Sequence, residues 1–295
     1  IINEFGILMQ IITLISDTGS QDYYVASIKG ALFKINPEFK IIDISHSIEA
    51  FDVANAAFQL RCCYQDFPDG TIHLIGVDSE PMIVPPAFSD DRKFIASYPT
   101  IMKFKNQYFI SNDNGFFGAF LDENKPQELW RYNINSDNIE EIKFPMKNCF
   151  VKIAEKIQNG DDIKTFADAV QSYKKAFIPK ALIEEFIIRG VVIHVDSFGN
   201  LITNITRQDF ERYPEDAPFT IRFHNDYFID VISETYNQVQ AGEKVAIFNE
   251  NDFLEIAVNR GATTTTGGAD KLFGVKTRDL VKIEFNPKGS LKTLF

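Results

Sequence analysis

The apolar run Ile11-Ile12-Thr13-Leu14-Ile15, followed by the polar turn Ser16-Asp17-Thr18-Gly19-Ser20, decides the fold of the first half of the chain. A continuous run of apolar and β-branched residues is typical of a strand that is buried on both faces of a mainly parallel sheet. Apolar residues then recur at helical spacing between Asp22 and Phe33. The stretch therefore predicts a strand, a polar turn and a helix.

The same pattern recurs twice further along the chain. A strand from Lys40 to Ile44 precedes a helix from Asp52 to about Asp66, and a third strand from Thr71 to Val77 ends at Asp78. In open α/β sheets, ligands bind at the carboxyl ends of the strands, which makes Asp17 and Asp78 candidate ligand-facing groups. Both have a structural alternative, since Asp17 could cap the following helix and Asp78 could cap its strand end.

After Gly190 the pattern changes from alternating strands and helices to strands alone. Two helical segments, 149–157 and 163–173, and a linker at 177–179 come before this change. The predicted strands are 191–195, 201–205, 219–223, 227–232, 244–248, 253–258 and 280–285, with one short helix at 207–213. We therefore expect an α/β domain over residues 9–178, with a mainly parallel sheet flanked by helices, and a smaller all-β, barrel-like domain over 190–295.

A polar corner, Asp196-Ser197-Phe198-Gly199-Asn200, joins two of these strands. A carboxylate, an aromatic ring and a carboxamide within five residues could face a ligand. The alternative is an ordinary turn, in which Asp196 and Asn200 bond only to the backbone of the turn.

Composition excludes several classes of function. The net charge of −11 argues against a nucleic-acid partner. Three Cys and four His without ligand spacing predict no metal site and no disulfide framework. There is no apolar stretch of membrane-spanning length and no basic leader, so we expect a cytoplasmic protein without a membrane partner.

Six short motifs, in order and at matching spacing, resemble the S-adenosylmethionine hydroxide adenosyltransferase family, which also contains the fluorinase and chlorinase. They are Leu14-Ile15-Ser16-Asp17-Thr18-Gly19, Lys29-Gly30, Asp43-Ile44-Ser45-His46, Phe67-Pro68-Asp69-Gly70-Thr71, Asp113-Asn114-Gly115 and Phe198-Gly199-Asn200-Leu201-Ile202-Thr203-Asn204-Ile205. The resemblance implies a homotrimer, in which the β-barrel-like domain of one subunit completes the nucleoside site of the next. It implies no cofactor beyond S-adenosylmethionine, which is the substrate or ligand.

The resemblance also implies roles for individual residues. Asp17 would bind the ribose hydroxyls, and Phe51 would pack near the ribose. Asp196 would meet the ammonium group of the ligand, and Phe198 and Asn200 would stack on and hydrogen-bond to adenine. Asn259 lies in the segment whose backbone would touch adenine. These side chains suit the ligand, because cations favour carboxylates and a purine favours an aromatic face and a carboxamide.

The catalytic residues of the family are matched only in part. Family hydrolases use an Asp, an Arg seven residues later and a His; here Asp78 is present, but Pro85 and Pro145 occupy the other two positions. A halogenase is no better matched, because Asp78 would put a carboxylate beside the halide. We therefore expect a protein that hydrolyses S-adenosylmethionine to adenosine and methionine with an altered catalytic set; the alternative is a non-catalytic adenosyl-ligand binder or sensor. His46 is a catalytic candidate by type, although a lone His in such a turn is more often structural.

Overall fold

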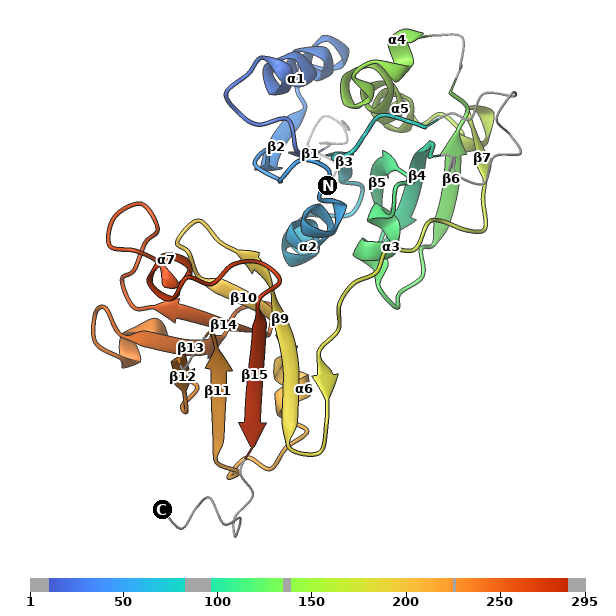
Figure 1. Ribbon diagram of the computed structural model, residues 1–295. Helices are drawn as coiled ribbons and strands as arrows, with labels where there is room; N and C mark the ends of the chain where they lie inside the picture. Colours follow the sequence, from blue (N-terminus) through green and yellow to red (C-terminus); the bar gives the residue numbers. More distant parts are fainter. Residues whose placement is uncertain (1–10, 83–96, 135–138, 225–226, 286–295) are drawn as a thin grey trace. The chain divides into compact units, whose positions relative to one another are not determined.

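The computed structural model describes residues 11–82, 97–134, 139–224 and 227–285. The chain divides into two compact units, Ile1–Ile178 and Pro179–Phe295, which are coloured blue to yellow and yellow to red in Figure 1. Each unit is described by itself. The predicted outer limits of the two domains, residues 9 and 295, lie outside the described residues.

The N-terminal unit is built on a seven-stranded mixed sheet with the order β2-β1-β3-β5-β4-β6-β7. The strands β2, β1, β3 and β5 pair in parallel, and β5, β4, β6 and β7 pair antiparallel. Their bounds are β1 Ile11–Ser16, β2 Lys40–Ser45, β3 Ile72–Gly76, β4 Pro99–Phe104, β5 Gln107–Asn112, β6 Glu128–Tyr132 and β7 Ala167–Ala169. The predicted strand and helix alternation is confirmed in the parallel half, and the antiparallel half begins with the β4–β5 hairpin.

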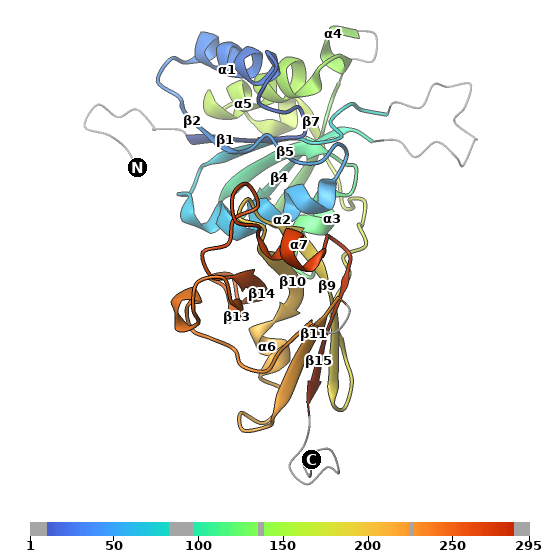
Figure 2. The ribbon, with the colours of Figure 1, turned by 60° about the vertical axis from the view of Figure 1, so that its left-hand side comes forward.

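Helices cover both faces of this sheet, as Figures 1 and 2 show. On one face, α1 (Tyr24–Ile35) and α5 (Val151–Gln158) pack on a core that includes Ile28 and Leu32. On the other face lie α2 (Val53–Cys63) and α3 (Phe116–Leu121). The short α4 (Ile139–Ile142) and a π-helical turn, Met146–Phe150, precede α5. No helix in the described part of the chain is long and apolar enough to cross a membrane.

The helix predicted over 163–173 is wrong. The chain instead forms a single 3-10 turn at Ile163–Thr165 and then β7. Ala169 and Ala167 of β7 pair with Trp130 and Tyr132 of β6. Pairing with the open edge of β6 satisfies the backbone of this segment, so tertiary contacts override its local helical pattern.

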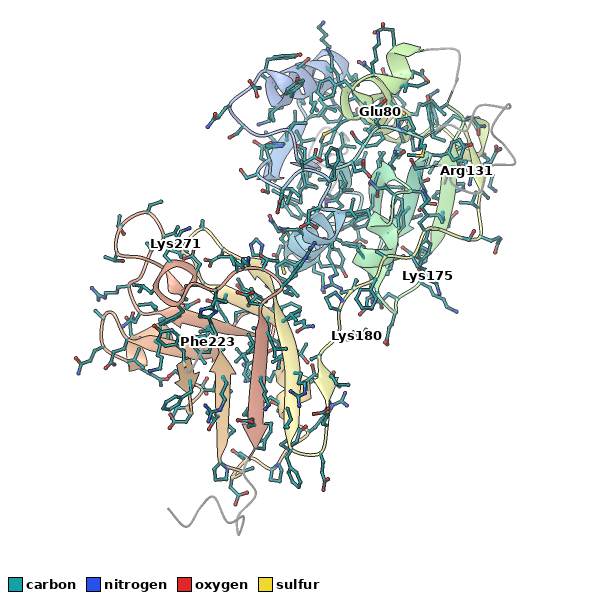
Figure 3. The ribbon with its side chains drawn as sticks, viewed as in Figure 1. Glu80, Arg131, Lys175, Lys180, Phe223 and Lys271 are labelled. Carbon is teal, nitrogen blue, oxygen red and sulfur yellow. The ribbon has the colours of Figure 1, made fainter. Side chains whose placement is uncertain are left out.

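The C-terminal unit is a nearly closed antiparallel sheet with the order β12-β11-β15-β9-β10-β14-β13, to which β8 adds at β9. Among the described residues of this unit, one isolated bridge, between Ile232 and Ala246, links the two ends of the sheet. Figure 3 labels Phe223, which is 2% exposed and belongs to the core inside this sheet. The predicted barrel-like fold is confirmed. The elements are β8 Leu182–Ile183, β9 Ile187–Val195, β10 Leu201–Thr206, α6 Arg207–Phe210, β11 Phe219–Phe223, β12 Tyr227–Ile229, β13 Lys244–Phe248, β14 Phe253–Val258, α7 Ala269–Phe273 and β15 Leu280–Phe285.

Candidate functional site

The carboxyl ends of β1 and β3 bring three of the predicted site residues together. Ser16 is in register with Gly76, so Asp17 and Asp78 follow adjacent strands. One oxygen of Asp17, Oδ2, accepts hydrogen bonds from the backbone N–H of Phe51 at 3.0 Å and of Asp78 at 3.2 Å. The structure therefore places Asp17, Phe51 and Asp78 at one edge of the sheet.

Both donors to Asp17 have a strained backbone. Phe51 has φ 67° and Asp78 has φ 45°, in the left-handed region that non-glycine residues rarely adopt. Such a conformation costs of order 1–3 kcal/mol per residue, and hydrogen bonds to a charged acceptor offset part of this cost. The Phe51 side chain is 72% exposed. Strain of this kind is concentrated at functional sites, and here it aims an aromatic ring and a carboxylate outward.

The carboxyl group of Asp78 is electrostatically suited to accept a proton. Partial burial and the nearby Asp17 raise its pKa, whereas Lys174 opposes this shift. Its backbone is fixed by Asn114, whose Nδ2 donates to the carbonyl of Val77 at 3.0 Å and to that of Asp78 at 2.9 Å. A general base works best when its pKa lies closer to the working pH than that of a free carboxyl group.

Lys174 and Asp113 also belong to this edge, and sequence reasoning missed Lys174. The carboxylate of Asp113 accepts from the backbone N–H of Lys174 at 2.8 Å, and burial raises the pKa of Asp113. Burial lowers the pKa of the Lys174 ammonium group, while Asp113 and Asp78 act in the opposite direction. Lys174 directly precedes Lys175, which is labelled in Figure 3. It follows a segment for which a helix was predicted, so no sequence signal connected Lys174 to Asp78.

The corner from Asp196 to Asn200 forms a tightly bonded turn. Asp196 Oδ1 accepts from the backbone N–H of Phe198 at 2.9 Å and of Asn200 at 2.8 Å, and Oδ2 accepts from Asn200 Nδ2 at 3.1 Å. The turn predicted as the structural alternative is therefore present. It leaves the Phe198 side chain 60% exposed, while Asn200 is 8% exposed.

The loop 261–270 packs against this turn at Gly199. Gly199 has φ 85°, and an added Cβ would lie 2.2 Å from Asp270 Oδ1 and 2.3 Å from Thr263 Oγ1. The carbonyl of Phe198 accepts from the backbone N–H of Thr263 at 3.1 Å, and that of Gly199 accepts from Asp270 at 3.0 Å. Only glycine combines this backbone conformation with so close an approach.

A buried carboxylate, Glu255, lies beneath the turn and was missed at the sequence level. It is 4% exposed and accepts from Tyr236 Oη at 2.6 Å and Asn249 Nδ2 at 3.2 Å. Burial raises its pKa, and the charge of Asp196 adds to this, while a hydrogen bond from Asn200 opposes it. The available signal was a lone acid within the apolar strand β14.

Asn259, at the end of the same strand, is 5% exposed and donates its side-chain amide to the carbonyl of Val239 at 2.8 Å. Its side chain thus serves the fold of the C-terminal unit. Among the described residues, no group of three or more His, Cys, Asp and Glu side chains could hold a metal ion.

Comparisons with known proteins point to one family. The family model described as "SAM hydroxide adenosyltransferase N-terminal domain" matches residues 12–167, and the corresponding C-terminal domain matches 190–282. The chain is 26% identical over 288 residues to "(R)-S-adenosyl-L-methionine hydrolase" of Methanocaldococcus jannaschii, covering 94% of this chain and 96% of that one. A protein of the same name from Thermus thermophilus is 25% identical over 264 residues, covering 86% and 94%.

A solved structure has the same fold over nearly the whole chain. It is described as an uncharacterized conserved protein from Thermotoga maritima, with a TM-score of 0.76, 27% identity and coverage of 92% of this chain and 99% of that one. The two domain models together cover well over half of the sequence, in the order in which the two units occur. The chain therefore belongs to the S-adenosylmethionine hydroxide adenosyltransferase family.

Proposed function

We propose that this protein binds S-adenosylmethionine and hydrolyses it to adenosine and methionine with an altered catalytic set. Membership of the family and similarity to two proteins named as S-adenosylmethionine hydrolases support this proposal. The reaction is attack of water on the ribose C5′, with the C5′–S bond breaking and its electron pair passing to the sulfonium sulfur. Neutral methionine is a good leaving group, so the protein has mainly to position the ligand and the water.

The observation that carries the proposal is the position of Asp78. Its backbone N–H is bonded to Asp17 at 3.2 Å, and its carboxyl group has a raised pKa at the carboxyl edge of the parallel strands. A carboxylate there can orient the attacking water by accepting a hydrogen bond from it, and it favours a nearby sulfonium cation. The same negative charge disfavours a halide as the nucleophile.

The remaining predicted residues are proposed as binding groups. Asp17 would accept hydrogen bonds from the ribose hydroxyls through Oδ1, because Oδ2 already accepts from the backbone N–H groups of Phe51 and Asp78. The exposed rings of Phe51 and Phe198 would cover the ribose and adenine. In the C-terminal unit the proposed contacts come from Asp196, Asn200 and Asn259.

A non-catalytic adenosyl-ligand binder is the second candidate. Pro145 stands where the family resemblance places a catalytic His; it directly precedes the π-helical turn and has no titratable group. Pro85, in place of the catalytic Arg, lies outside the described residues. A protein that kept the pocket but lost these groups would bind without turnover.

Incubation of the purified protein with S-adenosylmethionine, followed by chromatography for adenosine and methionine in equal amounts, tests the proposal. Calorimetry with S-adenosylmethionine and with adenosine runs in parallel. Equimolar products at a rate proportional to enzyme concentration support the hydrolase. Tight binding with no adenosine above the non-enzymatic background supports the binder, and absence of binding to either compound contradicts both.

A further inference from the structure

A chain of four side chains runs from the ligand-binding edge of the N-terminal sheet to solvent. Thr18 Oγ1 lies 2.9 Å from Ser16 Oγ, which lies 2.7 Å from His46 Nδ1. His46 Nε2 lies 3.1 Å from Asp43 Oδ1, a charge contact that does not meet the geometry of a hydrogen bond. Ser16 is 0% and His46 8% exposed, whereas the Asp43 side chain is 38% exposed. We call these residues the Thr18–Asp43 chain.

The chemistry of the contacts fixes the direction of every proton in this chain. A bare ring nitrogen 3.1 Å from a carboxylate oxygen would be repelled, so Nε2 of His46 carries the hydrogen. In the neutral imidazole Nδ1 is then an acceptor, and the hydroxyl of Ser16 must donate to it. Ser16 has no second hydrogen, so the hydroxyl of Thr18 donates to Ser16. The lone pairs of Thr18 Oγ1 are therefore left to accept from another molecule.

The two ends of the chain lie where a proton path needs them. Thr18 directly follows Asp17, whose carboxylate also bonds to the backbone N–H of Asp78, and Thr18 is only half-buried. At the other end, Lys29 Nζ lies 2.5 Å from Asp43 Oδ2. Burial alone would raise the pKa of Asp43, but its bonds to Lys29 and His46 hold that pKa below the ordinary value, so Asp43 stays charged and can stabilise an imidazolium. Asp43 on β2 contacts His46 directly, and Lys29 on α1 lies beyond Asp43.

We propose that the Thr18–Asp43 chain carries away the proton that hydrolysis of S-adenosylmethionine releases; this proposal rests on the proposed function. The cation and one water give adenosine, methionine and one H⁺, because the attacking oxygen must lose a proton once its bond to C5′ forms. That proton passes to Thr18 Oγ1 as the hydrogen of Thr18 moves to Ser16 and the hydrogen of Ser16 moves to His46 Nδ1. The imidazolium then passes its Nε2 proton to the partly exposed carboxylate of Asp43, which releases it to solvent. The imidazole ring then turns over and the hydroxyls reorient, which restores the starting arrangement. Thr18 is the residue that touches the water, and Ser16, His46 and Asp43 act through it.

Kinetics of Thr18→Val and Thr18→Ser test the proposal. Valine keeps the shape of threonine but cannot relay a proton, so we expect Thr18→Val to lower kcat about 10- to 100-fold with KM changed less than about two-fold. Thr18→Ser, which restores the hydroxyl, should recover most of the rate. Ser47→Ala, at an exposed neighbouring hydroxyl outside the chain, serves as the matched control and should retain the parent rate. A Thr18→Val variant that turns over as fast as the parent would overturn the proposal and leave the hydrolase intact.

Nitrogen NMR of the His46 ring gives a readout that needs no turnover. We expect the tautomer with hydrogen on Nε2, and a shift of the Nδ1 resonance when adenosine binds to the parent. The shift should disappear in Thr18→Val, provided calorimetry shows that this variant still binds adenosine. A ring with hydrogen on Nδ1, or a ligand-induced shift that is unchanged in Thr18→Val, contradicts the chain as a path. A parent that shows the coupled shift but forms no adenosine instead contradicts the hydrolase and supports a coupled binder.

Discussion

At the scale of single residues, Asp78 combines a strained backbone with a raised carboxyl pKa near the carboxyl end of β3. We expect Asp78→Asn to lower the rate of adenosine formation by roughly 10²-fold, because a neutral amide neither orients the attacking water nor stabilises a cation as a carboxylate does. The affinity for adenosine, measured by calorimetry, should change little. The matched control is Glu80→Gln, the same acid-to-amide change two residues further along; Glu80 is labelled in Figure 3. Parent-like turnover in a folded Asp78→Asn variant would reassign Asp78 to the role of a strand-end cap.

Asn200 provides the second test at this scale. Its amide bonds to Asp196 at 3.1 Å and contributes to the surroundings of the buried Glu255. We expect Asn200→Ala to weaken adenosine binding by roughly 1 to 3 kcal/mol, the cost of a buried polar group left without its partner. Calorimetry on the folded variant measures this, with the exposed Asn251→Ala as control. Unchanged affinity would return the corner at 196–200 to a purely structural role.

His73 makes the stability of the N-terminal unit depend on pH. It is 0% exposed, lies 2.7 Å from Thr13 Oγ1 and 3.0 Å from Gln107 Oε1, and burial lowers its pKa to about 4. Between pH 6.5 and 4 the unfolded chain takes up a proton that the native imidazole does not. The free energy of unfolding should therefore decrease as the pH falls through this window, by about 3 kcal/mol in total.

Fluorescence of Trp130, the only tryptophan, reports urea unfolding of this unit at pH 7, 6 and 5. The variant His73→Gln keeps a polar side chain but does not titrate, so its stability should fall less steeply with pH. Comparing slopes rather than absolute values cancels the contributions of the carboxyl groups. Equal slopes in the variant and the parent would contradict the assignment to His73.

Sequence reasoning placed Asp17 and Asp78 at strand ends correctly, because the end of an apolar run is a local signal. It could not find Lys174 or Glu255. The contact of Lys174 with Asp113 joins residues 61 positions apart. Glu255 has its role only because β14 lies beside β10, so that register brings it under the turn.

At the scale of elements, the turn at Gly199 depends on the loop that packs against it. We expect Gly199→Ala to lower the free energy of unfolding by roughly 2 to 5 kcal/mol, since it adds both a strained backbone and close contacts with Thr263 and Asp270. Gly242→Ala is the matched control, because Gly242 has φ 88° and nothing within 4 Å of an added Cβ. The control isolates backbone strain, at about 1 kcal/mol. Circular dichroism during urea unfolding measures both, and equal losses would show that the contacts at Gly199 relax at no cost.

Most elements were predictable, and the failure at 163–173 shows the limit. Strands such as β1 and β3 are mostly apolar and almost wholly buried, a pattern that few other structures produce. The segment at 163–173 has apolar residues at helical spacing, but its residues Ala167–Ala169 pair with β6 as a strand. An edge strand of three residues is too short to show a recognisable alternation of apolar and polar residues. Its conformation is determined by pairing with the neighbouring strand rather than by its own sequence.

At the scale of the whole molecule, the family resemblance predicts a homotrimer. We expect light scattering coupled to size exclusion to give a molar mass three times that of one chain. Binding of adenosine should be lost together with the oligomer on dilution, if the site needs a neighbouring subunit. A stable monomer that binds adenosine at full affinity would contradict this arrangement.

The sheet of the C-terminal unit is almost, but not fully, closed, and this has a consequence for how that unit opens. One bridge, from Ile232 to Ala246, is the link described between its ends, and β12 beside it is only three residues long. The opposite wall, β9 and β10, is paired on both sides. Amide hydrogens along β12 and the facing edge of β13 should therefore exchange with solvent quickly, through local fluctuations. Those of β9 and β10 should exchange slowly, only when the unit unfolds globally. We therefore expect local opening of this unit to begin between β12 and β13, away from its best-protected strands.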